Sequence, residues 1–267
     1  MRTIAPFGRR LAEIADVERL GGYVLLWVTD EDGPSDPRPG QFYMLAAETA
    51  WGAGEDERPW LPRAFSYCRA QSGRLGFLLE DVGPGTRRLA ELAPGDRMWL
   101  TGPLGSGFTP PDGGRRPLLV GGGIGVAPIL CWSDDLGPDA RVLLGFRNAD
   151  YAQCARLFAT EPVLATDDGS AGRRAYVTEL LREELDADPA ANVYACGPPQ
   201  MLEAVRALCA ERDVPAQLAM ESGMACGFGA CFGCVVPTRS GYVRLCVDGP
   251  VLAASDLDTA LTPGVGH

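Results

Sequence analysis

From Pro117 to Leu136 the sequence reads PLLVGGGIGVAPILCWSDDL. Its first residues form a continuous apolar run, which is typical of a strand buried on both faces of a parallel sheet. The residues from Ile124 onward predict a helix, in which Pro128 is tolerated because it lies in the first turn. The glycines between strand and helix would let the helix N-terminus approach a dinucleotide phosphate. A tight packing turn is the alternative, because the G-x-G-x-x-G fingerprint is not met.

Strands and helices continue to alternate after this unit. Apolar runs predict three further strands, at residues 141–146, 162–166 and 192–197. Amphipathic runs predict two helices, at residues 177–185 and 199–213, with Thr178 as the N-cap of the first. This order predicts a doubly wound α/β domain over residues 113–217 whose parallel strands carry a ligand at their ends.

The candidate nucleotide contacts lie at two of these strand ends. The first set follows the strand that begins at Pro117, and the second set ends the last predicted strand and opens the next helix. For the second set, an ordinary Gly-Pro helix start is the alternative. The candidates are Gly121, Gly123, Gly125, Cys196, Gly197 and Pro198.

Residues 1–112 predict an all-β domain. Five short apolar runs are separated by Gly, Pro and Asp clusters at even spacing, which favours a barrel, and residues 110–117 resemble a linker. Arg63 and Ser66 on one strand could hold a pyrophosphate, and so could a Gly-Pro-Gly-Thr turn that ends at Thr86. Each motif alone could equally be a solvated charge or an ordinary turn.

Composition narrows the function classes. The 267 residues carry a net charge of −11, which makes nucleic acid a poor partner. No apolar run approaches the roughly 20 residues of a membrane span, and the N-terminus lacks the apolar core of a secretory signal, so a cytoplasmic protein is expected. The single histidine is His267, so a metal site would have to use cysteine or carboxylate ligands.

Four of the nine cysteines have the spacing C-x4-C-x2-C-x11-C, and they are Cys226, Cys231, Cys234 and Cys246. The first three match the plant-type [2Fe–2S] arrangement, in which a more distant fourth cysteine follows. A structural zinc site is the rival, although zinc sites usually pair their cysteines in two short-spaced knuckles. The region 218–267 therefore predicts a small cluster-binding module. Four other cysteines are expected to be small buried hydrophobes, namely Cys68, Cys131, Cys154 and Cys209.

The order of these motifs resembles the ferredoxin–NADP reductase superfamily, with R-x-F-S on a barrel, then GGGIG-x-AP, then CGP. More closely, the sequence is similar to the electron-transfer subunits of class 1B dihydroorotate dehydrogenases. This likeness rests on Thr166-Asp-Asp-Gly-Ser170, on Met224-Ala-Cys-Gly227 and on Cys246-Val-Asp-Gly-Pro-Val251. It spans roughly residues 10–255 and implies a multi-domain protein, with an FAD-binding β-barrel, a doubly wound NAD-binding domain and a C-terminal [2Fe–2S] module.

The resemblance also implies roles for particular residues. Arg63, Ala64, Phe65 and Ser66 would contact FAD, Leu78, Leu79 and Glu80 would flank it, and Gly85 and Thr86 would hold its phosphates. The four clustered cysteines would ligate iron. Catalysis would need no protein acid or base, because the cofactors carry the chemistry.

The partner implied by the resemblance is an FMN-containing catalytic subunit that oxidises dihydroorotate in pyrimidine biosynthesis, in a heterotetramer with two copies of each chain. Electrons would pass from FMN to the cluster, then to FAD, then as hydride to NAD. A related reductase subunit, of the sulfide dehydrogenase or ferredoxin–NAD(P) oxidoreductase type, is one alternative, and a non-enzymatic zinc-stabilised binding protein is another.

Three features depart from the family pattern or leave a question open. Position 64 is Ala where relatives often have Pro, and residues 48–60 form a longer loop, interpreted as having no function. The choice between NAD and NADP stays open, because Arg147 rather than an acid follows the second strand of the α/β domain. Arg147 could suit a 2′-phosphate or be a solvated charge.

Overall fold

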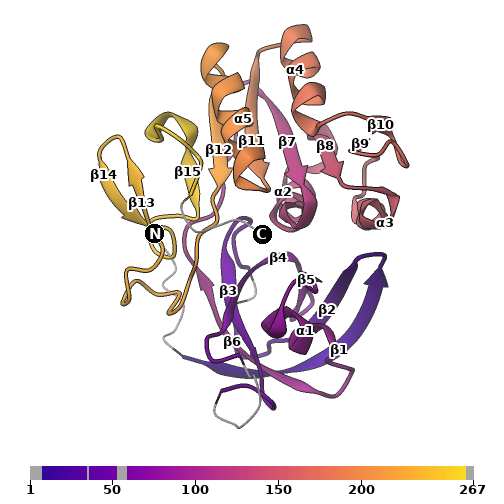
Figure 1. The fold of residues 1–267 in the computed structure, drawn as a ribbon, viewed down its shortest axis with the longest axis vertical. Coiled ribbons are helices and arrows are strands. Elements are labelled where there is room, and N and C mark those ends of the chain that lie inside the picture. The colour runs from indigo at the N-terminus through magenta and orange to yellow at the C-terminus, as the bar shows by residue number, and fades with distance from the viewer. Residues whose placement is uncertain (1–7, 35, 53–58, 263–267) are drawn as a thin grey trace.

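The computed structural model describes residues 8–34, 36–52 and 59–262. Figure 1 shows a β-barrel below an α/β domain, with the C-terminal strands beside both. Residues 53–58 of the predicted loop 48–60 lie outside the described residues. None of the helices in the described ranges is long and apolar enough to cross a membrane.

The N-terminal domain is a closed six-stranded antiparallel barrel in the order β1-β2-β5-β4-β3-β6. Its strands are β1 Arg10–Leu20, β2 Tyr23–Thr29, β3 Phe42–Ala47, β4 Arg63–Gln71, β5 Arg74–Glu80 and β6 Arg97–Leu104. The sequence predicted five of these strands and missed β1, whose charged residues mask its alternation. The predicted Gly-Pro-Gly-Thr turn is also corrected, because it opens the helix α1 Pro84–Ala90.

The second domain contains a seven-stranded sheet in the order β10-β9-β8-β7-β11-β12-β15. Its strands are β7 Arg116–Gly122, β8 Arg141–Phe146, β9 Val163–Thr166, β10 Arg173–Arg174, β11 Ala191–Cys196, β12 Ala216–Ala219 and β15 Val251–Ala253. All neighbours are parallel except β15, which runs antiparallel to β12. The doubly wound sheet is confirmed, and its order reverses between β7 and β11. The predicted boundary at residue 217 runs through β12, and β15 returns from the cysteine-rich region to the same sheet.

Four α-helices and several short 3₁₀ turns complete this domain. They are α2 Val126–Leu136, α3 Ala149–Ala152, α4 Val177–Ala187 and α5 Pro199–Glu211, with η1 Gly123–Gly125, η2 Gly137–Asp139, η3 Gln153–Leu157 and η4 Ala254–Asp256. The predicted N-cap Thr178 is wrong. Tyr176 is the N-cap of α4, and its backbone N–H donates to the Glu179 carboxylate at 2.8 Å.

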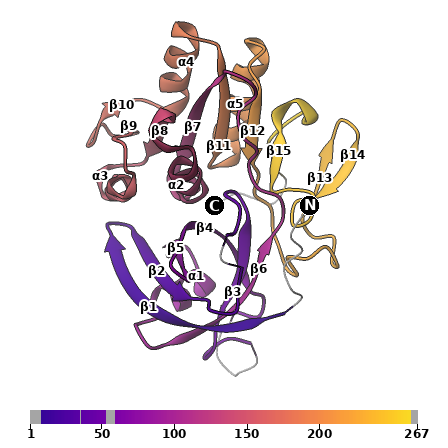
Figure 2. The same cartoon turned by 180° about the vertical axis from the view of Figure 1, so that it is seen from behind.

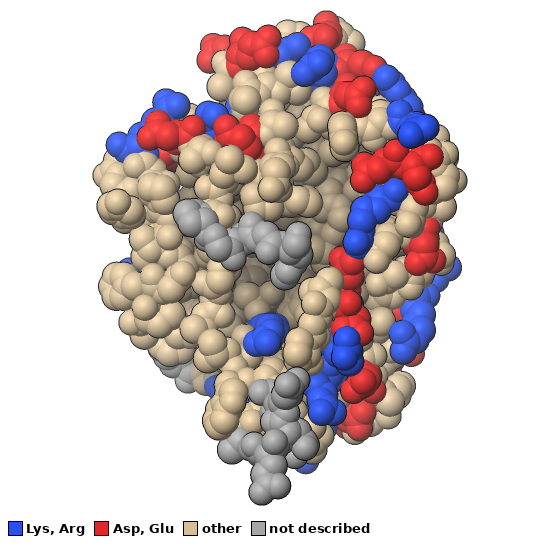
Figure 3. Space-filling view, in the orientation of Figure 1, with Lys and Arg blue, Asp and Glu red and all other residues tan. Residues whose placement is uncertain are grey.

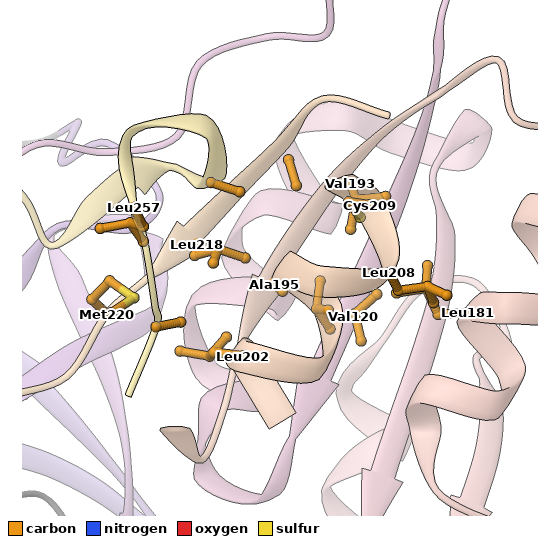
Figure 4. Packing of buried hydrophobic residues seen from close by; sticks show 14 of the residues in the cluster. Val120, Leu181, Val193, Ala195, Leu202, Leu208, Cys209, Leu218, Met220 and Leu257 are labelled. Atoms are coloured by element: carbon orange, nitrogen blue, oxygen red, sulfur yellow. The ribbon is translucent and has the colours of Figure 1, made fainter. Parts of the chain in front are cut away.

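Helices α4 and α5 cover one face of the sheet. Leu202 and Leu208 of α5 pack over Val193 and Leu218, and Leu257 from the C-terminal segment joins the same cluster (Figure 4). The C-terminal region is therefore anchored in the core of the α/β domain, and only the hairpin of β13 Val235–Thr238 and β14 Gly241–Arg244 forms a sheet of its own (Figure 2).

Helix α2 covers the other face of the sheet and also contacts the barrel. Ile129 and Leu130 of α2 share one buried cluster with Tyr23, Leu25 and Leu78 of the barrel. This common core fixes how the two domains sit against each other.

Ion pairs reinforce the same junction. The Arg69 guanidinium of β4 donates to both carboxylate oxygens of Asp134 on α2, at 2.6 and 3.1 Å, and also to the Leu157 carbonyl at 2.8 Å. Arg156 pairs with Glu18 of β1. Figure 3 shows acidic and basic side chains alternating down the flank on which β10, α3 and the β1–β2 hairpin lie.

The packing of α2 makes a prediction for stability. Leu130→Ala, which removes a side chain 2% exposed in the shared core, is expected to cost about 2–5 kcal/mol of unfolding free energy. Leu136→Ala, at the half-buried end of the same helix, is the matched control and is expected to cost less than about 1 kcal/mol. Urea unfolding followed by circular dichroism compares the two, and equal losses would contradict a core shared by both domains.

Candidate functional site

A cleft of about 660 Å³ opens between the α/β domain and the barrel. Its floor is formed at the carboxyl ends of four parallel strands, by Gly123 after β7, Arg147 after β8, Asp167 after β9 and Gly197 after β11. The reversal of strand order between β7 and β11 is where open parallel sheets bind their ligands. The opposite wall comes from the barrel residues Tyr23, Glu80 and Val82.

The predicted nucleotide contacts divide into two groups. Gly123, Gly197 and Pro198 line the cleft, as do Gly122 and Met201. The other three predicted contacts are buried and do not line it, namely Gly121, Gly125 and Cys196.

The buried glycines allow close packing behind the cleft. A Cβ on Gly125 would lie 2.4 Å from the Cys196 carbonyl oxygen, so η1 can press against the end of β11 only without a side chain there. A Cβ on Gly121 would lie 2.8 Å from Leu144. Burial, followed by the nearby Glu221 carboxylate, raises the pKa of the Cys196 thiol, so this side chain is held neutral.

A polar cluster that the sequence did not reveal joins the two walls of the cleft. The Arg147 guanidinium pairs with the Glu80 carboxylate across the cleft and lies 4.0 Å from the centre of the Tyr151 ring. The Tyr23 ring meets Tyr151 edge-on at 5.2 Å, and burial raises the pKa of Tyr23. No local motif marks these residues, because their partners are far apart in the chain.

The predicted FAD residues surround the start of α1. A Cβ on Gly85 would lie 2.5 Å from the Arg63 Nε, so the guanidinium packs directly on the first turn of the helix. The Thr86 hydroxyl accepts from the N–H groups of Val82 and Gly83 at 2.9 and 3.0 Å, and it holds the turn. Ala64 is exposed and Ser66 is half-buried on the same strand, β4.

The remaining predicted FAD residues differ in exposure. The side chains of Leu78 and Leu79 are 2% and 0% exposed and lie in the interdomain and barrel cores, so neither side chain reaches the cleft. Phe65 packs at the margin of the barrel core. Glu80 alone of the three flanking residues lines the cleft.

The four clustered cysteines are arranged in two pairs. The hairpin of β13 and β14 brings together Cys234 and Cys246, whose sulfur atoms are 3.2 Å apart. Cys226 and Cys231 form the second pair, in which the N–H and thiol of Cys231 lie close enough to Cys226 to lower its pKa. Among the described residues, no three Cys, His, Asp or Glu side chains converge as ligands of a single metal ion.

Backbone amides stabilise a thiolate at Cys226. Burial would raise the pKa of this thiol, but the N–H groups of Cys231, Phe228 and Ala230, with the Cys231 thiol, lower it to about 6. Burial and the neighbouring Cys234 thiol raise the pKa of Cys246 to about 12. Because iron ligation requires thiolates, cluster binding here would release protons.

The paired cysteines suit a [2Fe–2S] cluster, in which four thiolates serve two irons. The loop that carries Cys226, Cys231 and Cys234 also packs on the barrel, because a Cβ on Gly227 would lie 2.5 Å from the Met44 side chain of β3. Gly227 has φ +78°, a backbone conformation that glycine adopts readily.

Comparison with known proteins places this geometry in a family. The chain is 37% identical to the electron transfer subunit of dihydroorotate dehydrogenase B (NAD(+)) of Clostridium acetobutylicum, over 84% of this chain and 88% of that one. It is 34% identical to the subunit of the same name from Desulforamulus reducens, over 90% of this chain and 97% of that one. The chain belongs to this family.

Family models for parts of the chain agree with the membership. Residues 221–258 match the iron–sulfur cluster binding domain of dihydroorotate dehydrogenase B, and residues 144–207 match the oxidoreductase NAD-binding domain. The predicted family, the iron–sulfur cluster and the NAD-linked oxidoreductase class are thereby confirmed. The zinc alternative is not supported.

Solved structures share the fold. An NADH-dependent reduced ferredoxin–NADP oxidoreductase superposes with a TM-score of 0.78 at 23% identity, covering 95% of this chain and 91% of that one. Phthalate dioxygenase reductase superposes with a TM-score of 0.59 at 17% identity, covering 94% and 97%. The predicted three-part architecture of this dihydroorotate dehydrogenase B family member is confirmed.

The packing behind the cleft generates a second stability prediction. Gly125→Ala would force its new methyl group against backbone atoms of β11 and is expected to cost about 1–3 kcal/mol, with weaker nucleotide binding. Gly113→Ala is the control, since its Cβ would meet no atom within 4 Å. Thermal unfolding and NAD titration would measure both effects. A Gly125→Ala protein as stable as the Gly113→Ala protein would contradict the close approach.

Proposed function

We propose that this chain transfers electrons between a dihydroorotate-oxidising catalytic subunit and NAD, through a [2Fe–2S] cluster and FAD, in pyrimidine biosynthesis. The observation that carries the proposal is the pairing of Cys226 with Cys231 and of Cys234 with Cys246, beside the point where Gly227 packs against the barrel. Membership of the dihydroorotate dehydrogenase B family supports the same reading.

FAD suits the central position because a flavin exchanges single electrons with an iron–sulfur cluster and hydride with nicotinamide. In our proposal Arg63 binds the FAD pyrophosphate, because its guanidinium lies over Gly85 at the first turn of α1, where backbone N–H groups are available to an anion. Ala64, Phe65 and Ser66 extend the site along β4. Thr86 shapes the turn through its hydroxyl rather than by direct contact.

The cleft suits the nicotinamide nucleotide. Gly122 and Gly123 leave room for a phosphate at the point where the strand order reverses. Gly197 and Pro198 follow the neighbouring strand, β11, and line the same part of the cleft. The barrel residues Tyr23 and Val82 face these glycines across the cleft, so a nicotinamide bound there lies next to the barrel. Cys196 stays neutral and buried behind this position and supports it by packing.

We also propose the finer features of the assembly. The partner subunit contains FMN and associates with this chain in a heterotetramer with two copies of each. The functional parts correspond to residues 1–112 for FAD, 113–217 for NAD and 218–267 for the cluster, although β12 and β15 tie the last two parts into one sheet. A cytoplasmic location agrees with nine free cysteines.

The cofactor content tests the proposal most directly. Protein purified anaerobically is expected to show flavin absorption bands and about two irons and two sulfides per chain. The measurement is a visible spectrum combined with iron, sulfide and zinc assays. A colourless, zinc-loaded protein would refute the proposal and restore the structural zinc interpretation.

The division of labour between the cofactors gives a further prediction. Cys231→Ser is expected to lower dihydroorotate-dependent NAD reduction, assayed with the catalytic subunit, at least about 100-fold through loss of the cluster. NADH-driven dye reduction, which needs only FAD, should persist. Cys209→Ser, at a buried cysteine of α5, is the matched control and should keep both activities. Loss of dye reduction in a folded, FAD-replete Cys231→Ser protein would argue against this route.

A further inference from the structure

The outer end of the cleft, at the carboxyl end of β9, carries an acidic residue whose backbone is held in place. The backbone N–H of Asp167 donates to the Phe146 carbonyl at 3.0 Å, which pins the end of β9 to the end of β8. Asp167 lines the cleft, whereas its neighbour Asp168 accepts hydrogen bonds from the Ser170 N–H and hydroxyl at 2.9 and 2.6 Å. None of the described residues pairs with the Asp167 carboxylate, which is therefore available to a ligand.

In the proposed binding mode the adenosine half of the dinucleotide reaches this end of the cleft. From β7 to β9 the sheet spans two strand spacings, roughly 10 Å. With the nicotinamide next to the barrel and a phosphate at Gly123, the nucleotide runs along the strand ends toward Asp167. The Tyr176 ring, 69% exposed, lines the same end and offers a flat surface to a base.

The charges in the cleft oppose an additional phosphate. The acidic residues Glu80, Asp167 and Glu221 line it, and Arg147 is the only basic residue among the described lining residues. Arg147 is already engaged by Glu80 and lies over Tyr151. A 2′-phosphate carries between one and two negative charges and would find no uncommitted cation there.

Two arginines stand beyond this end of the cleft on β10. Arg173 pairs with Glu183 of α4 at 2.7 Å. The aliphatic part of Arg174 packs over Gly169, where an added Cβ would lie 2.9 Å from the Arg174 Cβ. Neither arginine lines the cleft.

We propose that Asp167 selects NAD over NADP, by accepting hydrogen bonds from the adenosine ribose and repelling a 2′-phosphate, while Glu80 withholds Arg147 from that phosphate. This inference rests on the proposed function, because it assigns the nucleotide specificity of the same cleft. It also addresses the choice between NAD and NADP that the sequence leaves open, because Arg147 taken alone could equally bind a 2′-phosphate.

The test measures the affinities of the FAD-loaded protein for NAD⁺ and NADP⁺ by isothermal titration calorimetry. The quantity compared is the ratio of the two dissociation constants, from which effects on shared parts of the nucleotides cancel. Wild-type protein is expected to prefer NAD⁺ by about 100-fold or more. Asp167→Asn is expected to reduce this preference about tenfold, which is the scale of a like-charge contact near a protein surface. Glu80→Gln should also reduce it, because Arg147 is released.

Matched variants make the outcome decisive. Asp168→Asn changes the adjacent acid, which does not line the cleft, and should leave the ratio unchanged, as should Arg174→Gln. An unchanged ratio in Asp167→Asn would overturn the inference, and so would wild-type protein that binds both nucleotides equally. NADH-driven dye reduction is recorded in parallel. If dye reduction is absent while NAD⁺ binding is tight and selective, the result counts against the proposed electron transfer and not against the role of Asp167.

Discussion

The burial of α2 between the sheet and the barrel is the constraint on which the rest of the molecule depends. Ile129 and Leu130 lie in one buried cluster with residues of both domains, so the two domains share one core rather than meeting at a polar interface. Charge pairs such as Arg69–Asp134 orient this junction, but the apolar contacts hold it. The cleft has a defined width because its two walls belong to domains that cannot move freely apart.

Close contacts between backbone segments also fix the geometry of the proposed cofactor sites. Gly125 allows η1 to touch the end of β11, and Gly227 allows the cysteine loop to reach Met44 on the barrel. In each case the missing side chain brings two functional segments nearer than any other residue would permit. Electron transfer depends steeply on distance, so a cysteine loop that packs directly on the barrel suits the proposed route from cluster to FAD better than one on a flexible tether.

Much of this arrangement could be predicted from the sequence, wherever a signal is local. The strands β7, β8, β9 and β11 and the four cysteine positions were recognised from apolar runs and spacing. Strand β1 was missed because its charged residues obscure the alternation, and β15 because a three-residue strand has no pattern of its own. The buried state of Cys68, Cys131, Cys154 and Cys209 was predicted correctly. Tyr23, Glu80 and Arg147 could not be brought together in advance, since the pairing of residues 67 positions apart depends on the finished fold.

The same long-range pairing explains why a motif can mislead about specificity. An arginine after the second parallel strand would ordinarily suggest a phosphate site, because the sequence shows its charge but not the residue that pairs with it. In the folded protein, Glu80 of the barrel pairs with Arg147 from the opposite wall of the cleft, so this arginine joins the two domains. In our proposal the acidic residue that contacts the adenosine ribose is Asp167, which follows the next strand, β9, and lines the cleft. Nucleotide choice in such a two-domain cleft is therefore a property of both walls, and it follows from which charges are already paired before the ligand arrives.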